Sequence, residues 1–305
     1  MDASITTPTL TPLPPGPLLL GVSGGGDSIA LLHLLLAQGQ ANRLHIATYN
    51  HNWGPFGPQA VAFVRSLCHT HNLPFHTATG QGKPATNAEA TARTERHTWL
   101  QATATQLGAS IVLAHTQTDL AESFLLRAGK GSGAGGLAAM QPLSTMGGVT
   151  YGRPLLNTSR ESLRTYLTAN GHTWLEDPDN ELGGSQRARI RKLLPALAAA
   201  GISAHGLAAS AQAVAQANAA LEAFTTSIPL TNPLPLPTLL NQPEDIALRL
   251  LLRLIQTIHP HQILPVRRTK RQSLLARLRT QPQGHATLSG VKFSWKNNQL
   301  SYKSQ

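Results

Sequence analysis

The stretch Leu18-Leu19-Leu20-Gly21-Val22-Ser23-Gly24-Gly25-Gly26-Asp27-Ser28 decides the fold of this chain. Its apolar residues come first, a Ser/Gly run follows, and a helical pattern of leucines begins directly after it. This order predicts a buried strand, a tight turn and a helix start, with Asp27 and Ser28 as candidate helix caps. Uncovered backbone N–H groups beside the positive end of a helix dipole favour an anion, most simply a phosphate. A glycine-rich turn without a ligand is the alternative.

Strand-like and helix-like segments alternate over the first half of the chain. Strands are predicted at 18–22, 44–49, 74–79 and 111–114, and helices follow the first turn to about 38 and cover 59–71, 87–107 and 120–127. Such alternation is typical of an α/β fold, a doubly wound parallel sheet with helices on both faces and ligands at the carboxyl ends of the strands. The turn at 23–28, Asn50-His51 and His115 then lie at the same edge of the sheet.

The second half of the chain has a different pattern. Helices are predicted at 159–169, 187–199, 203–226, 245–258 and 267–279, with a proline-rich connector at 229–237 and a hairpin around Lys296-Asn297-Asn298. We therefore expect a flexible tail over residues 1–16, a sheet domain over 17–200, and a mainly helical, basic portion over 201–305 that ends in the hairpin.

The positive charge is concentrated in the second half. Residues 1–150 contain 7 Lys+Arg and 6 Asp+Glu, residues 151–305 contain 18 and 8, and the net charge of the whole chain is +11. A nearly neutral first half and a basic second half indicate a catalytic unit joined to a surface that binds a polyanion such as RNA.

The cysteine count and the hydropathy narrow the class of protein. Cys68 is the single cysteine and lies in an apolar run, which excludes an intrachain disulfide or a CxxC site. No apolar segment of 18 residues occurs, and the Thr/Pro-rich start lacks the order of a signal peptide. We therefore expect a cytoplasmic protein with no membrane partner.

Four further segments carry candidate site residues. Residues 87–96 begin a helix with two arginines three apart, and residues 114–122 follow a buried strand with one imidazole and two carboxylates. Residues 131–137 match GxGxxG but follow a helix, which disfavours a dinucleotide site and favours a mobile substrate loop. The acidic turn at 176–180 precedes the cations of 187–192, which either contact phosphates or are simply exposed. Taken singly, each segment is also explained as a solvated face or a capped helix start.

Taken together, the segments resemble one family. Ser23 to Ser28 resembles the pyrophosphate loop (PP-loop) of the N-type ATP pyrophosphatases; it is not a Walker A loop, because no Gly-Lys-Ser/Thr follows. From about Leu18 to Leu197, further blocks are similar, in the same order, to the tRNA(Ile)-lysidine synthetase family. They are Asn50-His51, Asn87 to Arg96, Ala114 to Glu122 with Leu125-Leu126-Arg127, Arg153-Pro154-Leu155-Leu156, Asp177-Pro178-Asp179-Asn180 and Arg187 to Arg191. The resemblance implies a PP-loop ATP pyrophosphatase domain over 17–200 and an RNA-binding portion over 201–305.

The resemblance also implies a reaction. ATP adenylates the C2 oxygen of the wobble cytidine in a CAU-anticodon isoleucine tRNA, and the ε-amine of free lysine displaces AMP to form lysidine. The loop would hold the β,γ-phosphates, and Mg²⁺ would neutralise the developing charge. The implied partners are therefore ATP, Mg²⁺, this tRNA and free lysine, with a homodimer left open.

The resemblance assigns a role to each matching residue. It implies ATP binding by Ser23, Gly24, Gly25, Gly26, Asp27 and Ser28; metal binding by Asp27 and Asp119; catalytic roles for Asp27, Arg93, His115, Asp119 and Glu122; and substrate or RNA contacts for Asn87, Glu89, Arg96, Arg127, Arg187 and Arg191. Glu122 and His115 are both candidates for binding or deprotonating the lysine amine, and the sequence does not separate them.

The sequence departs from the family pattern at several positions. Paired histidines and paired aspartates become His115-Thr116 and Thr118-Asp119, so that one imidazole and one carboxylate are missing. The basic residue expected after Asn50-His51 is replaced, and Ala188 stands in place of an asparagine. Two alternatives follow: another PP-loop AMP-forming tRNA-modifying enzyme, such as a thiolase, or a non-catalytic RNA-binding relic. The single cysteine disfavours the thiolase, and the complete Ser23–Ser28 loop disfavours the relic.

Overall fold

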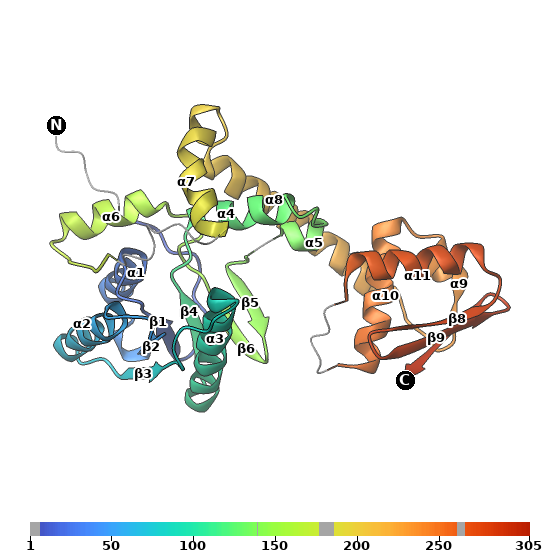
Figure 1. Ribbon diagram of the computed structural model, residues 1–305, viewed down its shortest axis with the longest axis horizontal. Coiled ribbons are helices and arrows are strands. Elements are labelled where there is room, and N and C mark those ends of the chain that lie inside the picture. The colour runs from blue at the N-terminus through green and yellow to red at the C-terminus, as the bar shows by residue number, and fades with distance from the viewer. Residues whose placement is uncertain (1–6, 139, 177–185, 261–265) are drawn as a thin grey trace. The chain divides into compact units, whose positions relative to one another are not determined.

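The computed structural model describes residues 7–138, 140–176, 186–260 and 266–305 (Figure 1). The chain forms two separately compact units, residues 1–215 and 216–305. The division between them falls inside helix α8 (Ala204–Ser227) rather than near residue 200, where the sequence pattern changes.

A six-stranded sheet forms the centre of the first unit. Its strand order is β3-β2-β1-β4-β6-β5. The strands are β1 (Leu18–Gly21), β2 (Leu44–Asn50), β3 (Phe75–Thr79), β4 (Ser110–Leu113), β5 (Leu143–Met146) and β6 (Val149–Gly152). All neighbours pair in parallel except β5, which pairs antiparallel with β6. The expected doubly wound parallel sheet is confirmed, and β5 and β6 extend it beyond the predicted strands.

The position of β1 in this sheet explains why its loop is suited to a ligand. β1 pairs with β2 on one side and with β4 on the other, with Leu18 opposite both Leu44 and Ser110. The chain therefore reverses its winding direction at β1, and a crevice opens at the carboxyl end of such a strand. The turn that follows Gly21 lies in that crevice.

Helices cover the two faces of the sheet (Figure 1). The helices of this unit are α1 (Gly26–Ala37), α2 (Phe56–Thr70), α3 (Ala88–Leu107), α4 (Gln117–Ala128), α5 (Ala134–Leu137), α6 (Arg160–Ala169) and α7 (Gln186–Ala199), with a 3₁₀ turn η1 (Ala41–Arg43). Because strand side chains alternate, Leu18 and Leu20 pack with α1, α2 and α6, whereas Leu19 packs with α3. The predicted helices of this unit are confirmed within a few residues.

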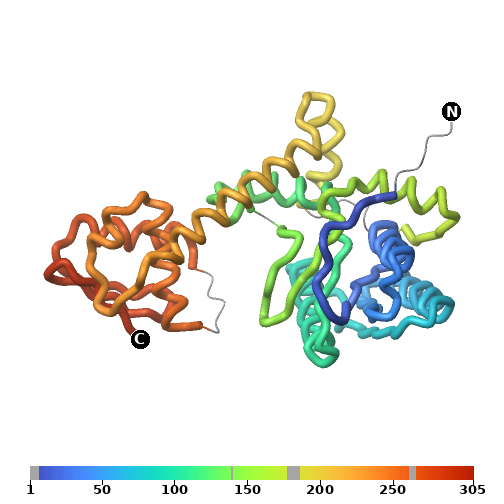
Figure 2. The backbone as a smooth tube through the Cα atoms, turned by 180° about the vertical axis from the view of Figure 1, so that it is seen from behind, coloured from blue at the N-terminus to red at the C-terminus, as the bar shows by residue number. Residues whose placement is uncertain are grey.

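The segment before β1 is attached to the first unit over its described part. The Thr11 N–H donates to the Pro154 carbonyl at 2.9 Å, and the Arg43 guanidinium donates to Pro14 O at 2.6 Å and to Gly16 O at 2.8 Å. Figure 2 shows the segment, in dark blue, following the surface before it enters β1. Residues 7–16 are therefore held in place rather than forming a free tail.

The second unit combines helices with a four-stranded antiparallel sheet of order β7-β10-β9-β8. The strands are β7 (Leu234–Pro235), β8 (Gly284–Leu288), β9 (Val291–Lys296) and β10 (Gln299–Ser304), and the helices are α9 (Leu236–Leu240), α10 (Glu244–Ile258) and α11 (Arg268–Thr280). The predicted hairpin is confirmed: Asn297 and Asn298 connect β9 to β10 with φ of 52° and 61°, the turn geometry that asparagine tolerates. β7 and β8 are strands that the sequence pattern did not reveal.

Apolar side chains from α10 and α11 pack on one face of this sheet.

Among the described residues no single helix is both long and apolar enough to span a membrane; α7 and α8 reach that length and composition only as a pair, with a bend of 106° between them.

Candidate active site

The turn after β1 is fixed by its two serines. The Ser23 N–H donates to Ser28 Oγ at 3.2 Å, Ser28 Oγ donates to the Gly25 carbonyl at 2.8 Å, and the two hydroxyl oxygens are 3.3 Å apart. Gly24 has φ of +85°, which only glycine adopts without strain. Gly25 is the N-cap of α1 and no side chain caps the helix, so the expectation that Asp27 or Ser28 caps it is wrong. Within the first turn of α1, the Ser28 N–H donates to the Gly25 carbonyl at 3.0 Å, whereas the N–H groups of Gly26 and Asp27 have no acceptor among the described residues.

The segment after β4 carries a second helix start. Thr116 is the N-cap of α4, and its N–H and hydroxyl both donate to Asp119 Oδ2 at 2.9 Å. This capping box holds Asp119 in place and buries it. Thr116, which stands in place of the second histidine of the family pattern, is therefore the helix cap. Thr118 is half-buried at the second position of the helix and does not have this role.

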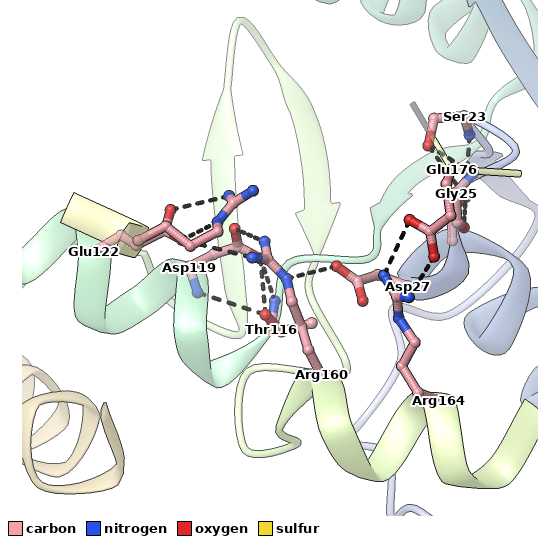
Figure 3. A network of polar contacts seen from close by, with 11 residues as sticks. Ser23, Gly25, Asp27, Thr116, Asp119, Glu122, Arg160, Arg164 and Glu176 are labelled. Carbon is pink, nitrogen blue, oxygen red and sulfur yellow. Dashed lines mark hydrogen bonds and ion pairs between the residues drawn. The ribbon is translucent and has the colours of Figure 1, made fainter. Parts of the chain in front are cut away.

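Arg160, the first residue of α6, joins carboxylates from two separate helix starts (Figure 3). Its Nε lies 2.9 Å from Asp27 Oδ2, its Nη2 2.7 Å from Asp119 Oδ1, and its Nη1 3.5 Å from Glu122 Oε1. Glu122 is fully buried and also forms an ion pair with Arg191, Nε to Oε1, at 2.7 Å. We call these three carboxylates and two arginines the carboxylate network.

Burial and charge act in opposite directions on the two aspartates of this network. Burial raises the pKa of Asp27, the nearby Asp119 charge adds to that rise, and Arg160 counteracts it only in part. Burial also disfavours the charged form of Asp119, but Arg160, His115 and the hydrogen bonds from Thr116 outweigh it and lower its pKa. Asp27 Oδ1 is buried without a hydrogen-bond partner among the described residues. Asp27 is therefore the less satisfied carboxylate and the one with a free oxygen.

A group of arginines lies beyond His115. Arg93 and Arg96 of α3, Arg153 after β6 and Arg187 of α7 are close enough to act on one another electrostatically, and we call them the arginine cluster. Burial and the neighbouring positive charges lower the pKa of Arg93 and Arg96. The Nε atoms of Arg96 and Arg153 are buried without a partner, and no described carboxylate lies within ion-pair distance of any of the four. The cluster is a concentration of positive charge suited to an anion.

His115 lies between the carboxylate network and the arginine cluster. Its burial lowers its pKa to about 3; Asp119 opposes the shift, and Arg153, Arg93 and Arg187 strengthen it. Nδ1 of His115 is buried and has no described hydrogen-bond partner. The ring is therefore neutral near pH 7, with a nitrogen that can accept a proton.

Three of the other candidate residues, Asn87, Glu89 and Arg127, lie outside both groups. Asn87 and Glu89 are exposed at the start of α3, where Asn87 is the N-cap with φ of 52° and makes no side-chain cap bond. Arg127 is exposed and donates to the Gly136 carbonyl at 2.7 Å, so that it holds the glycine-rich segment, whose residues 134–137 form α5. Arg187, a member of the arginine cluster, also donates to Ser123 Oγ at 2.9 Å. The 177–180 block lies outside the described residues; Glu176 is the last described residue before it.

Sequence reasoning missed Arg160, Arg153 and Arg164. An arginine at the first position of a helix opposes the helix dipole, a mismatch that marks Arg160 as placed for another purpose. Ser159 caps α6 by accepting from the Ser162 N–H at 3.1 Å, so the local pattern predicts the helix but not the direction of its arginine. Arg153 belongs to a block that carried the resemblance, yet nothing in its spacing shows that it lies beside Arg93.

Comparison with known proteins agrees with this geometry. A model of the PP-loop domain family matches residues 4–197. The chain is 39% identical over 221 residues to a tRNA(Ile)-lysidine synthase from Ruegeria pomeroyi, an alignment that covers 70% of this chain and 52% of that protein. It is 33% identical over 278 residues to one from Methylobacterium nodulans, covering 85% of this chain and 80% of that protein. The alignments to the first listed relatives span only 52% to 62% of their lengths.

A solved structure supports the fold alone. The U34-tRNA thiolase NcsA from Methanococcus maripaludis, solved with its [4Fe-4S] cluster, is similar with a TM-score of 0.55 at 14% identity, over 69% of this chain and 74% of that one. The loop lies at the switch point of the sheet, beside the network of carboxylates around Arg160. The family model matches residues 4–197, and one relative is covered over four-fifths of its length. The chain therefore belongs to the tRNA(Ile)-lysidine synthase family of PP-loop proteins.

Proposed function

We propose that this chain is an ATP-dependent ligase that adenylates the C2 oxygen of the wobble cytidine in a CAU-anticodon isoleucine tRNA and joins free lysine to C2. Adenylation releases pyrophosphate, and attack by the lysine ε-amine releases AMP and a proton to give lysidine. The observation that carries the proposal is that the PP-loop turn and the carboxylate network meet at Asp27, which belongs to both.

The turn supports binding of the departing pyrophosphate. Its backbone N–H groups and the positive end of α1 attract an anion, and the serine hydrogen bonds keep the turn in one shape before ATP arrives. Donors fixed in advance stabilise charge as it develops without having to reorganise.

Asp27 is the residue best suited to hold Mg²⁺ with the phosphates. Its Oδ1 is a buried oxygen without a partner, whereas both oxygens of Asp119 already accept hydrogen bonds. Mg²⁺ in nucleotide sites takes one or two carboxylates and completes its shell with phosphates and water, so Asp27 fits and Asp119 would join only after Arg160 moves away. The metal would neutralise charge on the phosphates.

His115 and Glu122 are suited to different tasks toward lysine. Glu122 is buried between two arginines, which suits a residue that holds Arg160 and Arg191 in position. His115 is neutral and has a free Nδ1, so we propose that it accepts the proton from the lysine amine. Phosphate charge placed near Arg93 and Arg153 offsets the effect of their charges, which would raise the pKa of His115 towards neutrality when ATP is bound.

The tRNA would be held by positive charge in both units. The arginine cluster supplies an unneutralised group of cations next to the reaction site. Residues 216–305 contain eleven Lys+Arg and three Asp+Glu. Such a surface favours the phosphate backbone of RNA.

A thiolase is the less favoured alternative. Cys68 is buried, and burial raises the pKa of its thiol to about 11. A thiol that is neither accessible nor ionised near pH 7 does not carry or activate sulfur.

The test is a mass analysis of tRNA nucleosides. A CAU-anticodon transcript incubated with the protein, ATP, Mg²⁺ and lysine should yield lysidine, and Asp27→Ala should abolish both lysidine and tRNA-dependent pyrophosphate release. Tight tRNA binding without either product would support the non-catalytic relic. A different nucleoside mass would point to another PP-loop modification.

A further inference from the structure

Arg164 lies one helical turn after Arg160, on the same face of α6, and reaches the start of α1. A Cβ built on Gly26 would lie 3.3 Å from Arg164 Nε and 3.4 Å from Trp174 Cδ1. The Arg164 charge also acts on Asp27. Arg164 is therefore beside the PP-loop turn, although its ion pair is with Glu176 and not with one of the three described carboxylates of the network (Figure 3).

The segment Trp174-Leu175-Glu176 lies against the same turn. The Leu175 N–H donates to the Gly24 carbonyl at 2.9 Å, and Leu175 Cδ1 is 3.5 Å from the position of a Cβ on Gly24. This backbone bond attaches the segment to the loop itself. The side chains on either side of Leu175 are consequently held next to the place where phosphates would bind.

Glu176 forms an ion pair with the guanidinium of Arg164. Nη1 of Arg164 pairs with Glu176 Oε1, and Nη2 lies 3.5 Å from Oε2. Trp174 Nε1–H donates to Oε1 at 2.6 Å, and the guanidinium carbon lies 5.4 Å from the centre of the Trp174 ring. The carboxylate thus accepts hydrogen bonds in the way a phosphate oxygen would, from a planar fork that suits phosphate equally well.

This ion pair is exchangeable. The side chains of Arg164 and Glu176 are 42% and 65% exposed, whereas Glu122 is fully buried. Solvent screens an exposed pair, so its partners separate at little cost, and a multiply charged phosphate group is a stronger acceptor than one carboxylate.

We propose that Arg164 binds a terminal phosphate of ATP and the released pyrophosphate, and that Glu176 holds Arg164 in the empty site by taking the place of that phosphate. The inference rests on the proposed use of ATP at this loop and assigns it a further binding residue. Glu176 competes with the ligand, so removing its charge should strengthen binding, whereas removing Arg164 should weaken it.

The experiment measures binding of inorganic pyrophosphate and of Mg²⁺–ATP to the full chain by calorimetry. Arg164→Ala should weaken pyrophosphate binding by about tenfold, the effect of one lost charge-assisted hydrogen-bonding group. Glu176→Gln should tighten it by roughly two- to fivefold, as expected for removal of a screened competing charge. When Arg164→Ala and Glu176→Gln are combined, the Glu176→Gln substitution should no longer tighten pyrophosphate binding, because the guanidinium for which Glu176 competes is absent.

Arg65→Ala is the matched control, since it removes one exposed arginine of the same unit from α2. Thermal unfolding of each variant reports whether it is folded, and Arg164→Lys, which keeps the charge but loses the fork, should give an intermediate affinity. Unchanged binding in Arg164→Ala, or weaker binding in Glu176→Gln, overturns the inference. Failure of the unsubstituted protein to bind either probe would instead contradict ATP use at this loop.

Discussion

The carboxylate network and the arginine cluster differ in how their charge is balanced. In the network, Arg160 and Arg191 are each bonded to carboxylates, and Glu122 is shared between them. In the cluster, the described part of the chain places no carboxylate against Arg93, Arg96 or Arg153. The first group is assembled before any ligand arrives, whereas the second keeps a charge that an anionic ligand would neutralise.

This difference assigns the two groups separate tasks. Paired charges fix geometry, because each side chain is held by another. Unpaired buried charges reduce the stability of the empty protein and increase its attraction for an anion. The proposed reaction, which combines a positioned nucleophile with a phosphate-rich substrate, would use both groups.

Removing the central cation should have the largest effect. Arg160→Ala leaves Asp27 and Asp119 without their ion-pair partner and leaves Glu122 with Arg191 alone. We therefore expect a loss of about 3 kcal/mol in unfolding free energy, as for other broken buried ion pairs, together with loss of pyrophosphate release. Denaturant unfolding and an adenylation assay measure the two effects. Arg160→Lys is the control, since it keeps the charge. If both variants were as stable as the unsubstituted protein, the Arg160 guanidinium would not stabilise the carboxylate network.

The two aspartates should respond with opposite signs. The pKa of Asp27 is raised, so its ionised form disfavours folding at neutral pH, and Asp27→Asn should raise the melting temperature. The pKa of Asp119 is lowered, so its ionised form contributes stability above the unfolded-state pKa, which is lost as pH falls through the folded pKa; Asp119→Asn should lower the melting temperature. Scanning calorimetry at pH 7 decides the signs, and a shift in the same direction for both variants would contradict this account.

Relieving repulsion in the arginine cluster should stabilise the empty protein but weaken its anion binding. Arg96→Gln removes one of several like charges, so we expect a small rise in melting temperature at low salt and a tRNA affinity reduced by roughly tenfold, on the order of one charged contact. Fluorescence anisotropy and melting curves measure both. Arg43→Gln is a poor control because Arg43 anchors the N-terminal segment, and Arg65→Gln is the suitable one.

His115 connects the two groups and should give a pH signature. Its folded pKa of about 3 is below the ordinary value of 6.5, so the unfolded chain binds the proton first and stability falls as pH drops from about 6.5 towards 3. His115→Asn should flatten part of this decline. His33 has a pKa of about 4 because of burial and its neighbours His172 and His71, and it contributes separately to the same pH range. The variant His33→Asn therefore measures the contribution of His33 to the loss of stability at low pH. If His115→Asn loses stability with falling pH as the unsubstituted protein does, His115 does not contribute to this pH dependence.

The cations of the second unit should have the smallest individual effects. Arg268 pairs with Asp245 at 2.6 Å and Arg271 donates to the Leu248 carbonyl at 2.9 Å, so both hold the unit together. Replacing Arg267 and Lys270 by glutamine should reduce the salt dependence of tRNA binding by roughly 0.7–0.9 log units per lost phosphate contact, with ATP affinity unchanged. An unchanged slope would leave the arginine cluster as the main electrostatic contact to RNA.

Much of this protein was determined by the sequence itself. The leucine run before Ser23 specifies a buried strand, the period of apolar residues specifies the helices, and the order of blocks identifies the family, because each depends on neighbours along the chain. For the same reason, the pattern predicted Asn297-Asn298 as a hairpin turn. Short strands such as β6 and β7, by contrast, exist because another strand pairs with them, and no local pattern shows that partner.

The tertiary structure alone decided which charges meet. Arg160 lies 133 residues from Asp27 and 41 from Asp119 in sequence, yet one guanidinium bonds to both. Thr116 is a residue type common at helix N-caps, and only its hydrogen bonds to Asp119 show that it also orients a site residue. The pKa values of Asp27, Asp119 and His115 diverge because burial and partner charges act through space, and such effects depend on distances that the fold sets and the sequence does not state.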